Sequence, residues 1–215
     1  MCIRDRPQSG KSTVEDIVAH YLKRMGYAIG EYRGGSRYSP LYDAPIDVLN
    51  ISLACKAVEF VVNSIGREKE VHKIFLLDRG IIDRCMFTEA LYRQGKIDER
   101  TASATKQFLT LDQLTNKIDG VFVFITSAES ALMRENENKL IQSEGGVMNK
   151  DFLEIMRSAV QAEAERWVRS IPDRNVIIFD TEDKKYKGKE KVVARDVVDN
   201  ISKIVPNATR IHRVR

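Results

Sequence analysis

The stretch Gln8-Ser9-Gly10-Lys11-Ser12-Thr13 opens the first segment of helical periodicity in this sequence of 215 residues. It matches the end of the P-loop pattern G-x-x-x-x-G-K-S/T, in which backbone N–H groups at the start of a helix cradle phosphate groups. Lys11 would reach the β and γ phosphates of ATP, and Ser12 would place its hydroxyl on Mg²⁺. The pattern predicts these nucleotide-binding residues: Ser9, Gly10, Lys11, Ser12 and Thr13. An ordinary helix N-terminus capped by Ser9 is the alternative.

The six residues in front of this stretch do not continue the P-loop pattern. Its first glycine would stand at position 5, where the sequence has Asp5, and an acidic side chain facing phosphate would be repulsive. P-loop proteins place the loop directly after a buried strand, and Met1-Cys2-Ile3-Arg4-Asp5-Arg6 is too polar to predict one. We therefore interpret residues 1–6 as a non-native N-terminal remnant and expect strand 1 of the sheet to be missing. A divergent loop with a genuine Asp5 is the alternative.

Apolar periodicity alternates between helix and strand along the chain, which predicts βα units, a parallel sheet and an α/β fold. Continuous apolar runs predict buried strands at 74–77, 121–125 and 176–179, and a shorter strand is expected at 27–32. Helical spacing predicts helices at 12–25, 46–68, 82–93, 99–117, 128–140, 151–168 and 189–205. We expect one P-loop domain over 7–206 and a basic C-terminal tail over 207–215.

Charge and composition argue against several kinds of partner. The net charge is +4, of which residues 4–6 contribute +1 and residues 210–215 contribute +3, so the body of the chain is near neutral. Because a duplex-binding surface needs a basic face, nucleic acid is not an expected partner. No apolar run has the length that crosses a bilayer, so no membrane is expected either. Three scattered cysteines fit a reducing compartment and predict a cytoplasmic protein.

A second motif, Asp78-Arg79-Gly80, directly follows the apolar run at 74–77. A carboxylate at the C-terminal end of a buried strand lies where α/β sheets bind ligands. In a P-loop protein such an aspartate can bind Mg²⁺. The arginine beside it can bridge phosphate groups of donor and acceptor. A surface turn with a local ion pair is the alternative.

With these two motifs the chain resembles the group of thymidylate kinases, deoxynucleoside kinases and nicotinamide riboside kinases. Members of that group carry D-R-x or E-R-x at the end of the third strand, and here Asp83 follows Asp78-Arg79 closely. The third residue is Gly80, where thymidylate kinases have an aromatic residue and deoxynucleoside kinases have a serine. The resemblance covers nearly the whole chain and implies a three-layer P-loop NTPase fold with the strand order 2-3-1-4-5.

The same resemblance implies roles for two further residues. Deoxynucleoside kinases place a glutamate at the end of the second strand as general base for the acceptor hydroxyl, and Glu31 resembles it, although the usual following proline is absent. A solvated charge at a strand end is the alternative. The group also has a lid, expected here near 134–150, whose arginine closes on the transferring phosphoryl group and excludes water. Arg134 would be that arginine, with an exposed amphipathic helix as the alternative.

Together these features predict a kinase that uses ATP and Mg²⁺ to phosphorylate a small molecule, a nucleoside or a nucleotide. The predicted catalytic residues are Lys11, Asp78, Arg79, Arg134 and Glu31, and the predicted metal ligands are Ser12 and Asp78. Two alternatives stay open: a kinase that acts on a polynucleotide or a sugar nucleotide, and a nucleotide-binding regulatory ATPase without an acceptor. A homodimer is a possible assembly.

Overall fold

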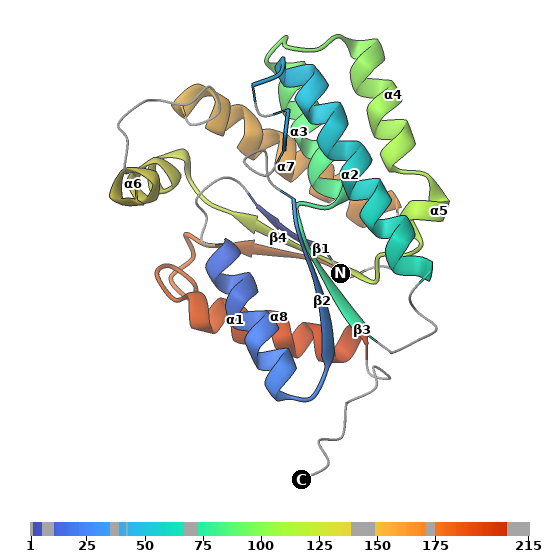
Figure 1. The fold of residues 1–215 in the computed structure, drawn as a ribbon. Coiled ribbons are helices and arrows are strands. Elements are labelled where there is room, and N and C mark those ends of the chain that lie inside the picture. Colours follow the sequence, from blue (N-terminus) through green and yellow to red (C-terminus); the bar gives the residue numbers. More distant parts are fainter. Residues whose placement is uncertain are drawn as a thin grey trace.

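The three apolar runs lie in one parallel sheet of the computed structural model, which describes residues 2–5, 11–34, 39–41, 43–66, 73–138, 149–170 and 175–205. The strands are β1 (Cys2–Asp5), β2 (Ala28–Arg33), β3 (Lys73–Asp78), β4 (Gly120–Ile125) and β5 (Asn175–Asp180). Their spatial order is β2-β3-β1-β4-β5 (Figure 1). Each neighbouring pair is parallel, so the carboxyl ends of the strands meet at one edge of the sheet. The fold is α/β, as predicted.

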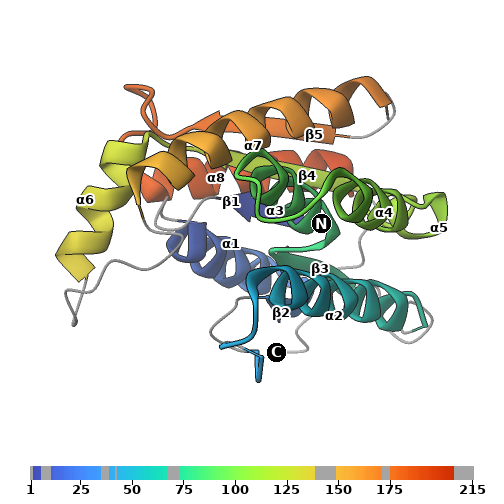
Figure 2. The same ribbon diagram turned by 90° about the horizontal axis from the view of Figure 1, so that it is seen from above.

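Helices cover both faces of this sheet and make three layers. They are α1 (Lys11–Arg24), α2 (Ile46–Gly66), α3 (Ile81–Arg93), α4 (Glu99–Leu109), α5 (Asp112–Thr115), α6 (Ala128–Asn138), α7 (Lys150–Ser170) and α8 (Glu190–Ile204). The pair α1 and α8 packs on one face, and α2, α3, α4 and α7 cover the other (Figures 1 and 2). Within the described ranges, no helix is both long enough and apolar enough to cross a membrane.

The side chains of β4 alternate between two hydrophobic cores. Val121, Val123 and Ile125 belong to the core under α2, α3 and α7. Phe122 and Phe124 belong to the core between the sheet and the α1–α8 pair. A strand with helices on both faces has no solvated side, which explains why its sequence is a continuous apolar run instead of an alternating one.

The expectation that strand 1 would be missing is wrong. Residues 2–5 form β1 in the central position, where Cys2 pairs with Leu77 of β3 and with Val121 of β4. The ladder is made by backbone groups, and two apolar neighbours supply partners on both sides whatever side chains the middle strand carries. The interpretation of residues 1–6 as a non-native remnant stays a prediction.

The helix predicted over 99–117 is divided in two. Helix α4 begins after Asp98, whose side chain accepts a hydrogen bond from the Thr101 N–H at 2.7 Å, and it ends at Leu109. The Thr110 hydroxyl donates to the Lys106 carbonyl at 2.8 Å, and Leu111 has an extended ψ of 136° before α5 begins. A threonine that bonds back to the preceding turn competes with continuation of a helix, which helical periodicity alone does not reveal.

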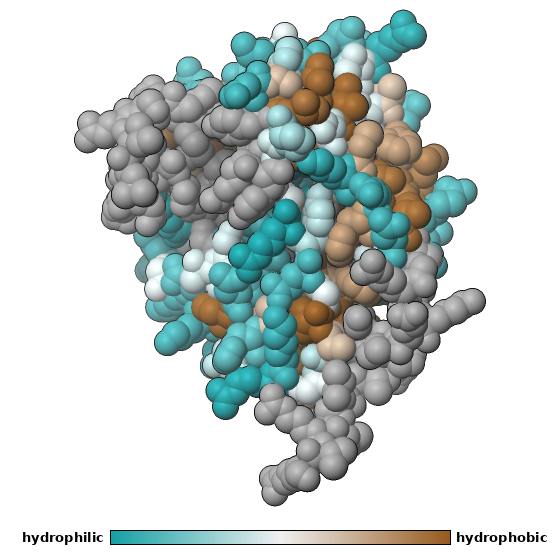
Figure 3. Space-filling model, in the orientation of Figure 1, coloured by the Kyte–Doolittle hydropathy of each residue, from teal (hydrophilic) through white to brown (hydrophobic). Residues whose placement is uncertain are grey.

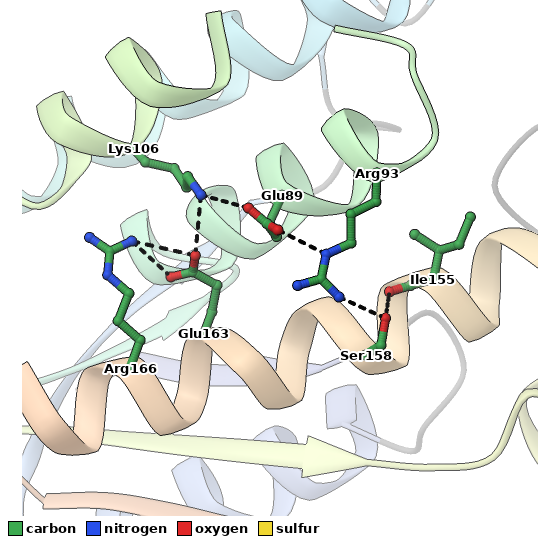
Figure 4. Close-up of polar contacts among 7 residues, drawn as sticks. All are labelled: Glu89, Arg93, Lys106, Ile155, Ser158, Glu163 and Arg166. Atoms are coloured by element: carbon green, nitrogen blue, oxygen red, sulfur yellow. Dashed lines mark hydrogen bonds and ion pairs between the residues drawn. The ribbon is translucent and has the colours of Figure 1, made fainter. Parts of the chain in front are cut away.

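Charged side chains tie α3, α4 and α7 together (Figure 4). Lys106 of α4 donates to Glu89 of α3 at 2.6 Å and lies 3.5 Å from Glu163 of α7. Glu89 also accepts from Arg93 at 2.8 Å, and Arg93 donates to Ser158 at 2.9 Å. Glu163, only 5% exposed, lies 3.4 Å from Arg166. We call these residues the α3–α4–α7 network.

Candidate active site

Helix α1 begins at Lys11 and places the remainder of the P-loop pattern at the carboxyl edge of the sheet. Its apolar face, which includes Val14, Val18 and Leu22, is buried in the core between the sheet and α8. Lys11 is buried with 5% exposure, whereas Ser12 and Thr13 are exposed on the first turn. The other two predicted nucleotide-binding residues, Ser9 and Gly10, lie outside the described residues.

Asp78 is the last residue of β3, and the ammonium group of Lys11 donates a hydrogen bond to its carboxylate. The two residues are 67 positions apart in the sequence. They meet because β3 ends beside the N-terminus of α1. Their side chains are 5% and 13% exposed, so the ion pair is largely shielded from water. The structure thus brings together the residues expected to bind phosphate and metal.

The backbone is tightly packed where β2 and β3 end. The Gly34 N–H donates to the Asp78 carbonyl at 3.0 Å. A Cβ added at Gly34 would lie 3.1 Å from the carbonyl oxygens of both Asp78 and Arg79, and 2.8 Å from the Tyr32 ring. Arg79 has a φ of 61°, a left-handed conformation that costs roughly 1–3 kcal/mol for a residue with a side chain. Strain of this kind concentrates at functional sites, which supports a role for the Asp78-Arg79 turn.

Glu31 pairs with Lys23 of α1. The predicted second strand extends beyond it to Arg33, which pairs with Asp78 in the sheet. The Lys23 ammonium donates to the Glu31 carboxylate at 2.5 Å, and Arg33 lies 3.6 Å from it. The hydrogen bond from Lys23 lowers the pKa of Glu31, with partial burial opposing it. Besides burial, the Glu31 charge raises the pKa of Glu15, which lies one helical turn after Lys11.

Arg134 is half-buried on α6, the helix that follows β4. Because β4 is parallel to its neighbours, α6 starts from the same edge of the sheet as Lys11 and Asp78. The predicted lid over 134–150 is described only at its two ends, and residues 139–148 lie outside the described residues. The role of Arg134 therefore stays a prediction.

Glu15 is a residue of this site that the sequence patterns did not bring out. It lies one helical turn after Lys11 and is 1% exposed, and its Oε1 atom has no hydrogen-bond partner among the described residues. Burial raises its pKa to about 7, although Lys11 and Arg33 favour the charged form. The available signal was its spacing, since Glu15 occupies a position of the buried stripe that includes Val14, Val18 and Leu22.

A second set of buried polar groups lies between α2 and α3. The Asn50 amide donates to the Thr88 hydroxyl at 2.9 Å, while the Asn50 Oδ1 atom has no partner within the described ranges. Asp83 is fully buried and accepts from Arg84 at 2.6 Å. The Arg84 guanidinium lies 5.2 Å from the centre of the Phe87 ring. The sequence signal for this set was the presence of Asp83 and Arg84 among the apolar residues of the α3 segment. Ten positions of α3 are buried, and these two are among them.

The arrangement of helices and strands is that of a P-loop kinase fold, and comparisons with solved structures bear this out. Three structures of deoxyadenosine kinase from M. mycoides match the chain, one with the products dCMP and a flexible dCDP bound, one with dCTP and one with dATP. The first is 15% identical with a TM-score of 0.62, and covers 94% of this chain and 98% of its own. The dCTP complex is 17% identical with a TM-score of 0.63, covering 93% and 100%. The dATP complex has the same identity and TM-score, covering 91% and 97%.

Sequence comparison adds nothing to this likeness, because no protein-family model and no curated protein matches the chain. At 15–17% identity the solved structures show a shared fold.

Proposed function

We propose that this protein is a P-loop kinase that transfers the γ-phosphoryl group of ATP to a hydroxyl group of a nucleoside or nucleotide. The observation that carries the proposal is the meeting of Lys11 and Asp78 at the carboxyl edge of the sheet, where the Lys11 helix begins and β3 ends. A lysine for phosphate and a carboxylate for metal at this place are the parts that P-loop phosphoryl transfer needs. The fold shared with deoxyadenosine kinases over more than nine-tenths of the chain supports the acceptor class.

The residues of this edge fit ATP and Mg²⁺. Lys11 would contact the β and γ phosphates, and Ser9, Gly10 and Thr13 would complete the phosphate cradle. The Ser12 hydroxyl is exposed on the first turn of α1. It and the Asp78 carboxylate are oxygen donors, the kind that Mg²⁺ prefers. Bound there, Mg²⁺ would neutralise charge on the phosphates.

Arginines and one glutamate would complete the chemistry. Arg79 follows Asp78 at the mouth of the site, and Arg134 lies on the helix after β4. Both would stabilise the negative charge of the transferring phosphoryl group. Glu31 would accept the proton of the acceptor hydroxyl, for which its ion pair with Lys23 would have to open.

We place the acceptor between α2 and α3, next to the Asp78-Arg79 turn. The Oδ1 atom of Asn50 is a hydrogen-bond acceptor without a partner among the described residues. An amino group of a nucleobase is a donor of matching chemistry. Unpaired buried polar atoms are costly, so a ligand that pairs with this oxygen gains specificity. The compounds bound to the deoxyadenosine kinases are nucleotides of adenine and cytosine, both of which carry such an amino group.

A panel of acceptors tests the proposal. The purified protein is incubated with Mg²⁺ and labelled ATP together with each ribonucleoside and deoxyribonucleoside, each monophosphate, a sugar nucleotide and a 5′-hydroxyl oligonucleotide. We expect label on a nucleoside or nucleotide, with adenine and cytosine compounds preferred. If only the oligonucleotide or only the sugar nucleotide is labelled, that compound class is the acceptor, and the proposed nucleoside or nucleotide acceptor is wrong. ATP hydrolysis without any labelled acceptor would favour a regulatory ATPase.

We further propose that the protein is cytoplasmic and forms a homodimer, in which α2 of one subunit packs against α2 of the other. Val48, Ile51 and Val62 of this helix are 44%, 44% and 51% exposed, and Cys55 is exposed midway between Val48 and Val62. Figure 3 shows apolar side chains gathered over α2 and the neighbouring α4. A two-fold interface must be self-complementary, and antiparallel pairing centred on Cys55 sets Val48 against Val62 of the second copy.

Cross-linking and light scattering test this interface. Mild oxidation should link two chains through Cys55, and Cys55→Ser should prevent the link. Val62→Glu should convert the dimer to a monomer with an unchanged thermal melt. A wild-type protein that is monomeric at micromolar concentration would refute the dimer.

A further inference from the structure

Glu15 is an unusual residue to find beneath a phosphate-binding lysine. It follows Lys11 by four positions, so the two side chains lie on the same face of α1. That face packs on β1, β2 and β3. The Glu15 side chain is 1% exposed, and Oε1 has no hydrogen-bond partner in the part of the chain that the structure describes. A buried carboxylate without its full set of partners is expensive to keep ionised.

Among the described residues, the charged groups that act on Glu15 lie on α1 and β2. On α1 they are Lys11 and Asp16, and on β2 they are Glu31 and Arg33. The two cations already engage other carboxylates, since Lys11 donates to Asp78 of β3 and Arg33 pairs with Asp16. Burial outweighs both cations and raises the pKa of Glu15 to about 7. At neutral pH the residue is therefore divided between its acid and its carboxylate.

Nucleotide binding, which rests on the proposed function, would change the ratio of the protonated to the ionised form of Glu15. The phosphates add negative charge beside Lys11, one turn from Glu15. Lys11 would turn from Asp78 toward those phosphates, which neutralise its charge, so it would support the Glu15 carboxylate less than in the free protein. Both changes disfavour the carboxylate form of Glu15, because like charges at short range in a shielded site repel strongly.

We propose that Glu15 is a positioning residue that takes up a proton from solvent when the nucleotide binds, so that a neutral acid lies beneath Lys11 in the complex. A neutral Glu15 does not compete with the phosphates for the ammonium group. An ionised Glu15 would offer Lys11 a second buried partner at a favourable helical spacing. The residue thus couples the affinity for nucleotide to pH.

The sign of this coupling follows from linkage. The nucleotide complex binds more protons than the free protein, so affinity falls as pH rises above about 7, by at most about tenfold per pH unit. Below about pH 6, Glu15 is protonated in both states and contributes no dependence. The nucleotide and other groups titrate as well, and a variant that removes only Glu15 separates their contributions.

Calorimetry tests the proposal directly. Binding of a non-hydrolysable ATP analogue with Mg²⁺ is titrated near pH 7.5 in two buffers of different ionisation enthalpy, which counts the protons taken up. We expect wild type to take up about half a proton or more beyond Glu15→Gln. Glu99→Gln, at an exposed position of α4, is the matched control and should behave as wild type. In turnover assays the KM for ATP should rise with pH in wild type more than in Glu15→Gln, while kcat stays within about threefold.

The outcomes separate this inference from the proposed function. Equal proton uptake by wild type and Glu15→Gln would overturn it. If Glu15→Gln does not fold, Glu15→Met serves as the second neutral variant, and a wild type that takes up no proton between about pH 7 and 8 overturns the inference without any variant. A wild type that binds no nucleotide at any pH would instead refute the proposed function.

Discussion

Two ionic clusters lie on either side of the sheet, and their charges are arranged differently. In the α3–α4–α7 network each carboxylate has two cations: Glu89 has Lys106 and Arg93, and Glu163 has Lys106 and Arg166. At the candidate active site one carboxylate oxygen of Glu15 has no partner among the described residues, and the cation above it is engaged by Asp78.

We interpret this difference in pairing as a difference in role: the paired charges stabilise the fold, and the charges of the second cluster belong to the candidate ligand site. A cluster whose charges are all paired can stabilise the packing of three helices and needs nothing more. A cluster with an unmatched buried group is costly by itself, and in the proposed nucleotide complex this cost falls because Glu15 takes up a proton. We therefore expect substitutions in the first cluster to change stability, and substitutions in the second to change activity.

The largest expected effect is that of Lys11→Ala. We expect it to abolish measurable phosphoryl transfer, a loss of about a thousandfold or more, and to weaken ATP binding, because a positioned cation for the developing charge disappears. Steady-state kinetics and nucleotide titration measure this loss. Lys117→Ala, an exposed lysine in the turn between α5 and β4, is the control. Unchanged turnover in Lys11→Ala would end the P-loop assignment.

Glu31→Gln tests whether the active cluster extends to β2. We expect turnover to fall by up to about a hundredfold, the lower end of what a general base supplies, while ATP affinity stays nearly intact. Asp78→Asn should behave differently and lose both activity and Mg²⁺ dependence. Loss of ATP binding in Glu31→Gln would contradict its assignment to the acceptor side. An unchanged turnover would leave Glu31 as a partner of Lys23 only.

Lys106→Met breaks the paired cluster in its middle. Methionine keeps the length of the side chain but leaves Glu163, 5% exposed, with Arg166 at 3.4 Å as its one remaining cation among the described residues. We expect the free energy of unfolding to fall by about 2 kcal/mol, because a buried acid loses a charged hydrogen-bond partner. Urea unfolding measures it, with kcat per folded molecule unchanged. Arg93→Met, which removes an i,i+4 pair, should cost about 0.5 kcal/mol. A loss of kcat in Lys106→Met would show that the two clusters are coupled.

A small expected effect, and one that depends on pH, concerns Glu182, which follows β5 and joins it to the start of α6. Partial burial opposes ionisation, but hydrogen bonds from Thr126, Ser130 and the Ser127 N–H lower its pKa to about 2. A carboxylate with a depressed pKa stabilises the fold above its unfolded value of 4.5, and this stability is lost as pH falls toward about 2. Wild type should exceed Glu182→Gln by about 1 kcal/mol at neutral pH. The difference should shrink in unfolding curves between about pH 4.5 and 3, and a constant difference would contradict the assignment.

Local patterns made much of this fold and site predictable. The run at 121–125 could be assigned because a strand covered on both faces must be apolar throughout. The proximity of Lys11 and Asp78 could be predicted because one begins a helix, the other ends a buried strand, and a parallel sheet brings such ends to one edge. Neither inference needed the identity of a distant partner.

What escaped prediction depends on tertiary partners or on the backbone. The polar residues Arg4 and Asp5 gave no indication that residues 2–5 pair through their backbone with β3 and β4. The buried pair of Asn50 and Thr88 joins residues 38 positions apart. The ion pair between Glu31 of β2 and Lys23 of α1 was also not predicted, because a sequence does not reveal which residues of a strand and a helix lie within reach of each other.

The close approach of Gly34 to the Asp78-Arg79 turn also limits how this protein could be re-engineered. Redesign of an acceptor site usually begins by lengthening side chains around its rim. At position 34 even a methyl group would meet two carbonyl oxygens at 3.1 Å, and those oxygens belong to rigid backbone that cannot rotate aside. Any side chain at position 34 would therefore require the turn to shift by a few tenths of an ångström. In the proposed acceptor site, we therefore expect substitutions on the helices to be better tolerated than substitutions at Gly34.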